Sequence, residues 1–186
     1  MRLPTGILKA SYVGPSMMCQ QFRALRSDYG NDRLLRQVRD NVTLKHYPVF
    51  LDLQDRPVLV VGAGKVALRK TRGLVEAGAR VTVIAPEWES EFEALPVRLV
   101  PRRFRVADLA GHVLVFAATN DRLTNHRIGI AANGKGVFAN IADSAGECGF
   151  IVPARVQRGG VQIAISTGGE NPRLSAELRM KLDQIL

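Results

Sequence analysis

The stretch PVLVVGAGKVALRK, residues 57–70, constrains the fold of this chain more than any other part of its sequence. It begins with five apolar residues and no polar alternation, which is typical of a strand buried on both faces of a parallel sheet. Gly62 then allows a tight turn, and Gly64 leaves room for a diphosphate near the backbone. Ala67 is small enough for the next helix to pack on the strand. The stretch is therefore a Gly-x-Gly-x-x-Ala turn between a strand and a helix.

The residues that follow complete a βαβ unit. The pattern predicts a helix over residues 65–77, ended by Gly78, and a second buried strand over residues 80–85. The N-terminus of such a helix offers free N–H groups and the positive end of its dipole to phosphate. A purely structural turn is the alternative, because glycines also mark turns that bind nothing. The sequence favours dinucleotide binding. The residues predicted to hold the cofactor here are Gly62, Gly64, Lys65 and Val66.

The end of the second predicted strand departs from the usual pattern of dinucleotide sites. An Asp or Glu about 20 residues after the glycines ordinarily binds the adenosine ribose, but here the strand runs into Ala85 and Pro86. Glu87 is the nearest carboxylate, and we expect it to serve from the loop beside Pro86. Since no arginine in this loop favours a 2′-phosphate, the predicted cofactor is NAD rather than NADP.

Strands and helices continue to alternate as far as Ile141, which predicts an α/β fold with a Rossmann-like, doubly wound parallel sheet. The further predicted elements are an acidic helix over 87–95, an edge strand over 97–100, a turn or single helical turn over 108–111, a strand over 113–119, a helix over 122–133 and a strand over 137–141. Ligands bind such sheets at the C-terminal ends of the strands. Thr119 and Asn140 are therefore predicted to contact the cofactor, and Asp143 is a candidate site residue.

The C-terminal part of the chain has a different pattern. Two strands are predicted over residues 150–153 and 161–166, and the connection between them is too short for a parallel crossover, so antiparallel or swapped pairing is expected. A last helix is predicted to begin with Asn171 as N-cap and Pro172 as its first residue. Its apolar stripe predicts a partner surface, either a second subunit or a helical segment outside this sequence. The stripe consists of Leu174, Leu178, Leu182 and Ile185.

The sequence divides into three parts. Residues 1–44 show no sustained period and are predicted to be a flexible or peripheral extension, with a transit peptide or a misassigned start as alternatives. Residues 45–147 are the predicted NAD-binding domain. Residues 148–186 are the predicted dimerisation and substrate-binding segment. No apolar run approaches the ~18 residues of a membrane span, and a cytoplasmic protein is expected.

Composition excludes several kinds of site. Cys19 and Cys148 are too few and too far apart for a disulfide framework or a metal site, and the three histidines show no metal-ligand spacing. The net charge of +9 permits nucleic acid, an anionic membrane or a polyanionic small molecule as a partner. Aromatic residues are not interleaved with the basic ones as in a single-strand binder. We expect neither nucleic acid nor membrane as a partner, and no bound metal.

Five motifs occur in a fixed order along the chain: YPVFLDL at 47–53, VVGAGKVALRK at 60–70, AATND at 117–121 with Asn125, NIAD at 140–143 and STGGENP at 166–172. Together they resemble the siroheme synthase N-terminal family, the NAD-dependent precorrin-2 dehydrogenases, some of which are also sirohydrochlorin ferrochelatases. The resemblance covers most of the chain, from about residue 45 to residue 186.

This resemblance implies a homodimer that oxidises precorrin-2 to sirohydrochlorin with NAD and whose tail strands and helix exchange between subunits. In some members the same site also inserts ferrous iron. The family's essential aspartate corresponds to Asp143. Its substrate loop corresponds to Ser166, Thr167, Gly168 and Gly169, although Thr167 stands where some members have serine. The chain ends where relatives usually continue into a helical region, which bears on chelation more than on dehydrogenation.

The implied substrate is a tetrapyrrole with eight carboxylates, which gives the basic charge balance a reason. Arginine binds carboxylates with two parallel hydrogen bonds, and Arg127 and Arg155 are predicted to bind the substrate, although solvated surface arginines are the simpler interpretation. Asp143 is predicted to be the catalytic base that accepts the proton lost with the hydride; an Asx-turn residue is the alternative. The competing function is a redox-sensing or regulatory module that binds NAD without catalysis. A short-chain dehydrogenase is disfavoured because no tyrosine has a lysine four residues later.

Overall fold

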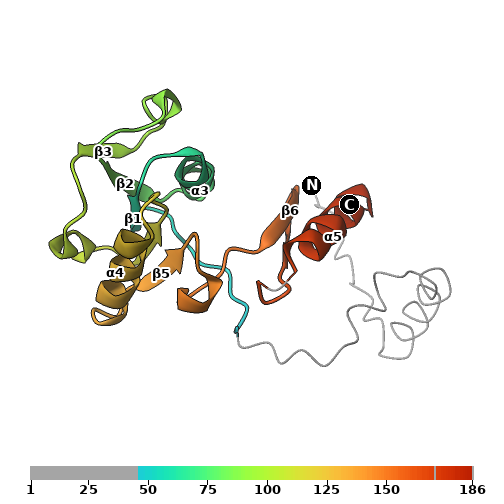
Figure 1. Cartoon of the computed structure of the whole chain (residues 1–186). Coiled ribbons are helices and arrows are strands. Elements are labelled where there is room, and N and C mark those ends of the chain that lie inside the picture. Colours follow the sequence, from blue (N-terminus) through green and yellow to red (C-terminus); the bar gives the residue numbers. More distant parts are fainter. Residues whose placement is uncertain (1–45, 170, 186) are drawn as a thin grey trace, which may run out of the picture. The chain divides into compact units, whose positions relative to one another are not determined.

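The computed structural model describes residues 46–169 and 171–185. The predicted extension over 1–44 and Cys19 lie outside the described residues. Five parallel strands form one sheet in the order β3-β2-β1-β4-β5 (Figure 1). The strands are β1 (Pro57–Val61), β2 (Arg80–Ala85), β3 (Arg98–Pro101), β4 (Leu114–Ala117) and β5 (Phe138–Ile141). This order confirms the predicted Rossmann-like, doubly wound sheet.

Two helices cover opposite faces of this sheet, as Figure 1 shows for α3 (Lys65–Glu76) and α4 (Arg122–Asn133). Successive residues of a strand point to opposite faces, so Val58 and Val60 pack on the α3 side, and Leu59 and Val61 pack on the α4 side. Both faces of β1 are therefore buried, as its continuous apolar run predicts. The layers place the N-termini of α3 and α4 at the edge where the strands end.

The acidic helix predicted over residues 87–95 is wrong. The structure has only a 3-10 turn, η1 (Ser90–Phe92), in this segment. The predicted helix is nine residues long, which is too short to be stable without a packed face, and Phe92 alone in the turn is buried in the core. Two further short turns are η2 (Val106–Leu109), where a helical turn is predicted, and η3 (Ala145–Glu147).

The first tail strand is also predicted at the wrong place. The observed strands are β6 (Ala154–Arg158) and β7 (Val161–Ile165), which pair antiparallel as expected. Phe150, one of the apolar residues before β6, packs on the core: its ring lies edge-on against the Phe116 ring, with 5.3 Å between the ring centroids. The Phe150 carbonyl accepts a hydrogen bond from the Asn140 side chain at 3.1 Å. Core packing and not strand pairing therefore explains Phe150, whereas Val152 of the same run is 55% exposed.

The last helix, α5 (Pro172–Ile185), begins as predicted. The Asn171 side-chain oxygen accepts a hydrogen bond from the Leu174 N–H at 2.9 Å, which confirms Asn171 as the cap. The burial of the predicted apolar stripe falls along the helix: Leu174 is buried, Leu178 and Leu182 are half-buried, and Ile185 is 62% exposed. No helix within residues 46–169 and 171–185 is long and apolar enough to cross a membrane.

Candidate functional site

The ends of the parallel strands lie level along one edge of the sheet, which we call the carboxyl edge. The Gly62 N–H donates to Ile84 O at 2.9 Å, the Ala118 N–H donates to Val61 O at 2.8 Å and the Ala142 N–H donates to Ala117 O at 2.9 Å. The residues that follow β1, β4 and β5 are thus neighbours in space. The direction of winding reverses between β1 and β4, and such a switch point is where doubly wound sheets bind ligands.

The glycine turn after β1 is shaped for close approach. Gly62 has φ +97, and a Cβ at this position would lie 2.3 Å from the backbone oxygen of Ala118. No other residue fits there. A Cβ at Gly64, in contrast, would meet nothing within 4 Å, and Gly64 is the N-cap of α3 without a side-chain cap. Lys65 and Val66 are exposed in the first turn of α3. The turn therefore presents an open helix N-terminus, which suits a diphosphate.

The loop after β2 lies against this turn. The Glu89 N–H donates to the carbonyl oxygen of Ala63 at 3.1 Å, which ties the loop to the residue between the two glycines. Pro86 and Glu87 are both exposed just before this tie. The Glu87 carboxylate thus lies in a loop at the carboxyl edge, and its contact with a ribose stays a prediction.

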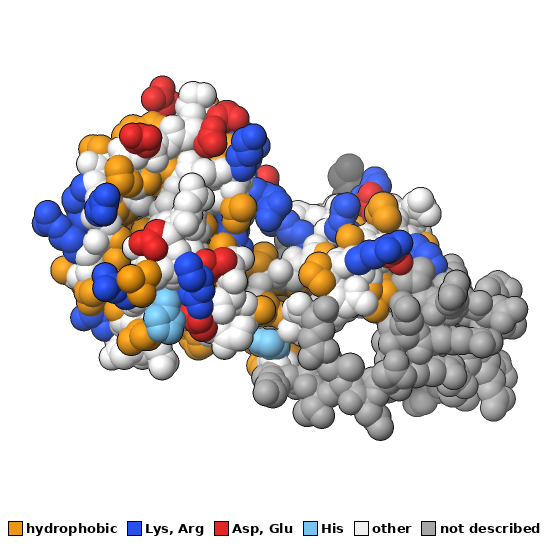
Figure 2. Space-filling model, viewed as in Figure 1, with side chains coloured by type: hydrophobic (Ala, Val, Ile, Leu, Met, Phe, Trp, Pro, Cys, Tyr) orange, Lys and Arg blue, Asp and Glu red, His pale blue; other side chains and the backbone are white. Residues whose placement is uncertain are grey.

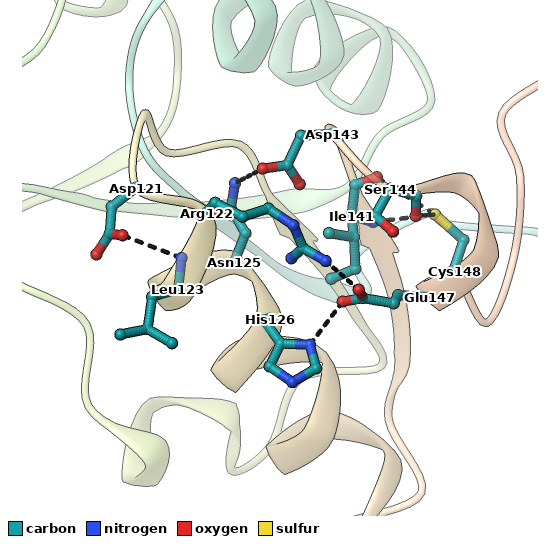
Figure 3. Close-up of polar contacts among 10 residues, drawn as sticks. All are labelled: Asp121, Arg122, Leu123, Asn125, His126, Ile141, Asp143, Ser144, Glu147 and Cys148. Carbon is teal, nitrogen blue, oxygen red and sulfur yellow. Dashed lines mark hydrogen bonds and ion pairs between the residues drawn. The ribbon is translucent and has the colours of Figure 1, made fainter.

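A buried amide joins the loops that follow β4 and β5, and Figure 3 shows its bond to Asp143. Asn125, in the first turn of α4, is 0% exposed. Its side-chain oxygen accepts from the Thr119 N–H at 3.1 Å and from the Thr119 hydroxyl at 2.7 Å. Its side-chain nitrogen donates to Thr119 O and to Asp143 Oδ2, both at 3.0 Å. The exposed Asp143 carboxylate therefore bonds to a side chain of another element and not to the backbone of its own turn.

Further contacts hold the loop after β5 in place. The Glu147 carboxylate pairs with the Arg122 guanidinium and with the His126 ring, with 2.9 Å between Glu147 Oε2 and His126 Nδ1 (Figure 3). Two residues of α4 therefore hold the turn η3 in place. The Cys148 thiol accepts from the Ile141 N–H at 3.1 Å and approaches Ser144 O at 3.3 Å. The Arg122 guanidinium, followed by His126, lowers the pKa of Glu147 to about 2.

This pKa shift predicts a pH dependence of stability. Because the pKa of Glu147 falls from 4.5 to about 2 on folding, its contribution is complete above pH 4.5 and is lost as the pH falls towards 2. The difference in free energy of unfolding between the wild type and Glu147→Gln should therefore shrink between those pH values. Urea unfolding at several pH values measures it. A free-energy difference that stays constant across this pH range would contradict the prediction. At neutral pH, 1 M salt should make this difference smaller, because the ion pair is exposed.

The Asn140 side chain is buried and already hydrogen-bonded within the protein. It is 6% exposed in β5, its oxygen accepts from Lys70 Nζ at 2.8 Å and its nitrogen donates to Phe150 O. Burial lowers the pKa of Lys70, and the charge of Arg69 adds to this effect. The Lys70 ammonium also lies 5.4 Å from the centre of the Phe116 ring. The Asn140 amide is thus engaged inside the fold, and its contact with the cofactor stays a prediction.

The predicted substrate loop follows β7. Gly168 and Gly169 both have positive φ, and a Cβ at Gly169 would lie 3.7 Å from the Ala145 Cβ, which brings this loop close to the loop of Asp143. The Thr167 hydroxyl donates to Asn171 O at 2.9 Å, and the Ser166 hydroxyl accepts from the Gly168 N–H at 3.1 Å. Both hydroxyls therefore stabilise the loop itself.

The two predicted substrate arginines lie in different places. Arg127 is exposed on α4, and its charge adds to the hydrogen bond from Thr124 that lowers the pKa of Asp121. Arg155, which falls between the two predicted tail strands, lies in the observed strand β6. It pairs with Glu76 at the end of α3 that is remote from the carboxyl edge. Figure 2 shows Lys and Arg side chains scattered among others on this face of the described residues. The structure does not bring Arg155 together with Asp143.

From the sequence, Asn125 is only part of a family motif and no role is predicted for it, although it bridges Thr119 and Asp143. The signal was a polar residue at an inward position of α4, where Ile128 and Ala132 follow on the same face.

Among the residues that the structure describes, no three His, Cys, Asp or Glu side chains gather as a metal site would require.

Comparison with known proteins places this geometry in a family. Residues 49–154 match the family of putative NAD(P)-binding proteins, and residues 158–185 match the central region of sirohaem biosynthesis proteins. The solved structure of SirC, precorrin-2 dehydrogenase, is similar, with a TM-score of 0.68 and 32% identity over 76% of this chain and 71% of that chain. The sheet with its C-terminal strand pair and helix is thus a known arrangement.

Curated relatives are longer than this chain. Siroheme synthase 2 of Aeromonas hydrophila is 41% identical over 145 residues, which are 77% of this chain and 31% of the relative. Siroheme synthase of Ectopseudomonas mendocina is 42% identical over 142 residues, which are 75% of this chain and 31% of the relative. The chain therefore spans about a third of the length of these relatives.

Proposed function

Because this chain belongs to the family of putative NAD(P)-binding proteins of sirohaem biosynthesis that includes SirC, we propose that it is a precorrin-2 dehydrogenase. It oxidises precorrin-2 to sirohydrochlorin with NAD as the acceptor. The observation that carries the proposal is the carboxyl edge, where the open turn at Gly64 and the anchored carboxylate of Asp143 follow strands of the same sheet.

The residues at this edge have separate tasks in the reaction. NAD, when bound, supplies the acceptor for a hydride. Gly64 and the first turn of α3 hold its phosphates, because the helix N-terminus has no side-chain cap, and Gly62 makes the tight turn that leads into it. Oxidation removes two hydrogens from precorrin-2: one leaves as the hydride, and Asp143 accepts the other as a proton. The products are sirohydrochlorin and NADH, and the proton on Asp143 returns to water.

The substrate class follows from charge and position. Precorrin-2 is a polycarboxylate, and Arg127 with the loop of residues 166–169 supplies a guanidinium and N–H groups for it. The closeness of Gly169 to Ala145 supports this role for the loop, since Ala145 is two residues from Asp143. Arg155 binds substrate only if its pair with Glu76 opens.

An anaerobic assay of the purified chain tests the function. We expect sirohydrochlorin to form from precorrin-2 when NAD is present and not when it is omitted, as followed by absorption spectra. A chain that binds NAD in calorimetry but leaves precorrin-2 unchanged would instead be a redox-sensing or regulatory module. Adding ferrous iron to the product tests the further possibility of chelation. The cytoplasm is the compartment we propose for this reaction.

We further propose that the tail makes a homodimer. Along α5 and the hairpin, large apolar side chains such as Val161, Met180 and Ile185 are at least half exposed, and such surfaces are commonly subunit contacts. Light scattering at micromolar concentration should give twice the 20.4 kDa chain mass. Met180→Asp should give a monomer, whereas Ile130→Asp, which changes an even more exposed apolar residue on α4, should not. A wild-type monomer would contradict the prediction.

A further inference from the structure

We propose that Asn125 is the positioning residue for the catalytic base: its amide holds Asp143 Oδ2 and so directs Oδ1 towards the substrate. The inference rests on the proposed function and deepens it. It concerns a residue that touches neither the cofactor turn at Gly64 nor the substrate loop, and it derives from burial and hydrogen bonding.

All hydrogen-bonding capacity of the Asn125 amide is used. An amide side chain has two acceptor sites on oxygen and two N–H donors on nitrogen. The oxygen accepts from the Thr119 N–H and from the Thr119 hydroxyl, which also lies 3.0 Å from Asp121 O, and the nitrogen donates once to Thr119 O and once to Asp143 Oδ2. A fully buried amide whose bonds are all satisfied has one stable orientation, because a rotated amide would leave buried polar groups unpaired.

The backbone of Thr119 determines which way the amide points. A backbone N–H only donates and a carbonyl oxygen only accepts, so the Thr119 N–H must meet the Asn125 oxygen and Thr119 O must meet its nitrogen. The second hydrogen of that nitrogen then points to Asp143. The donor role of Asn125 towards the carboxylate therefore follows from the backbone and not from a choice between oxygen and nitrogen.

The anchor restricts an otherwise exposed carboxylate. Asp143 is exposed in a turn, and a carboxylate without a fixed partner exchanges its two oxygens by rotation about χ2. Arg122 is nearby, but it hydrogen-bonds to Glu147. Asn125 itself is held by the start of α4, where its N–H donates to Asp121 O at 3.0 Å. Thr119 and Asp143 thus share one rigid support, which fixes the base relative to the end of β4.

Kinetics of Asn125→Ala test this role. A misplacement of about 1 Å at a reacting group costs roughly 100-fold in rate, so kcat should fall about 10- to 100-fold. The KM for precorrin-2 and the Kd for NAD should change by less than about threefold, since positioning acts on the chemical step. Thr124→Val is the matched control: its hydroxyl bonds to Asp121 in the same helical turn without touching Asp143, and it should keep wild-type kcat.

A double-mutant cycle separates positioning from a merely structural role. If Asn125 acts through Asp143, then adding Asn125→Ala to Asp143→Ala should lower kcat by no more than about twofold further. Equal losses in both backgrounds would overturn the proposal. A wild-type kcat for Asn125→Ala would overturn it as well. A wild-type chain without precorrin-2 oxidation would overturn the proposed function first, and this role with it.

A measurement on folded protein remains decisive if Asn125→Ala does not fold. The side-chain amide protons of Asn125 in ¹H–¹⁵N spectra should shift when Asp143 is changed to Ala and should stay in place in Thr124→Val. Unchanged amide resonances in Asp143→Ala would show that the anchor does not exist in solution and would overturn the proposal regardless of activity.

Discussion

Replacing Asp143 by alanine is expected to lower the turnover of precorrin-2 by about 10²- to 10⁴-fold, the usual cost of losing a general base. The fold and the Kd for NAD should be unchanged, because Asp143 is exposed in a turn and contributes a single side-chain hydrogen bond, from Asn125. Single-turnover kinetics with excess enzyme and calorimetric titration of NAD measure the two effects separately. Asp52→Ala, which removes an exposed loop carboxylate before β1, is the control and should keep wild-type turnover.

Asp143→Asn distinguishes a base from a residue that only orients substrate. The new amide oxygen still accepts from Asn125, so the side chain keeps its place but loses its basicity. A base predicts a loss as large as in Asp143→Ala, whereas an orienting residue predicts near wild-type turnover. If both variants oxidise precorrin-2 normally while NAD binds, Asp143 is not the base.

Gly64→Asp should abolish useful NAD binding. A side chain at this position points into open space at the N-terminus of α3, so the sheet should fold as before. Its negative charge would stand where the diphosphate binds, and such like-charge contact costs several kcal/mol. We expect a Kd at least about 100-fold higher, equivalent to roughly 3 kcal/mol.

The matched control for this change is Gly160→Asp. Gly160 likewise has no atom within 4 Å of a Cβ and no positive φ, but it lies in the turn between β6 and β7. Calorimetry should give wild-type NAD affinity for this variant. Unchanged affinity in Gly64→Asp, with thermal melting that confirms its fold, would show that the cofactor binds elsewhere.

Strands and helices were predictable where one physical signal dominated. The strands Pro57–Val61 and Arg80–Ala85 have the predicted bounds, because buried strands are rich in β-branched and apolar residues and here end at glycine or proline. The helix Arg122–Asn133 also has its predicted bounds, and its N-cap is Asp121. The strand predicted over 150–153 is wrong, because a short apolar run can reflect a core contact, here that of Phe150 with Phe116, as well as a strand.

The site was predictable only in its backbone features. Glycines and strand ends are local, so Gly62, Gly64 and Thr119 are expected at one edge from the alternation of elements. The bond from Asn125 to Asp143 joins positions 18 residues apart and depends on how β4 and β5 align. No periodicity in the sequence encodes that alignment. The same holds for the pairing of Arg155 with Glu76, 79 residues apart.

The joint between Lys70, Asn140 and Phe150 has a consequence for how this chain can be divided. The Asn140 side-chain oxygen accepts a hydrogen bond from the Lys70 ammonium, and its nitrogen donates one to the Phe150 carbonyl. The Phe150 ring packs against Phe116 of β4. A fragment that stops at the end of β5 would leave the buried Asn140 side-chain N–H without its acceptor and would expose the Phe116 ring on the α3 side of the sheet. The cofactor-binding half is therefore not a transplantable module unless it is cut beyond Phe150, and any graft of this sheet onto another protein must carry that residue with it.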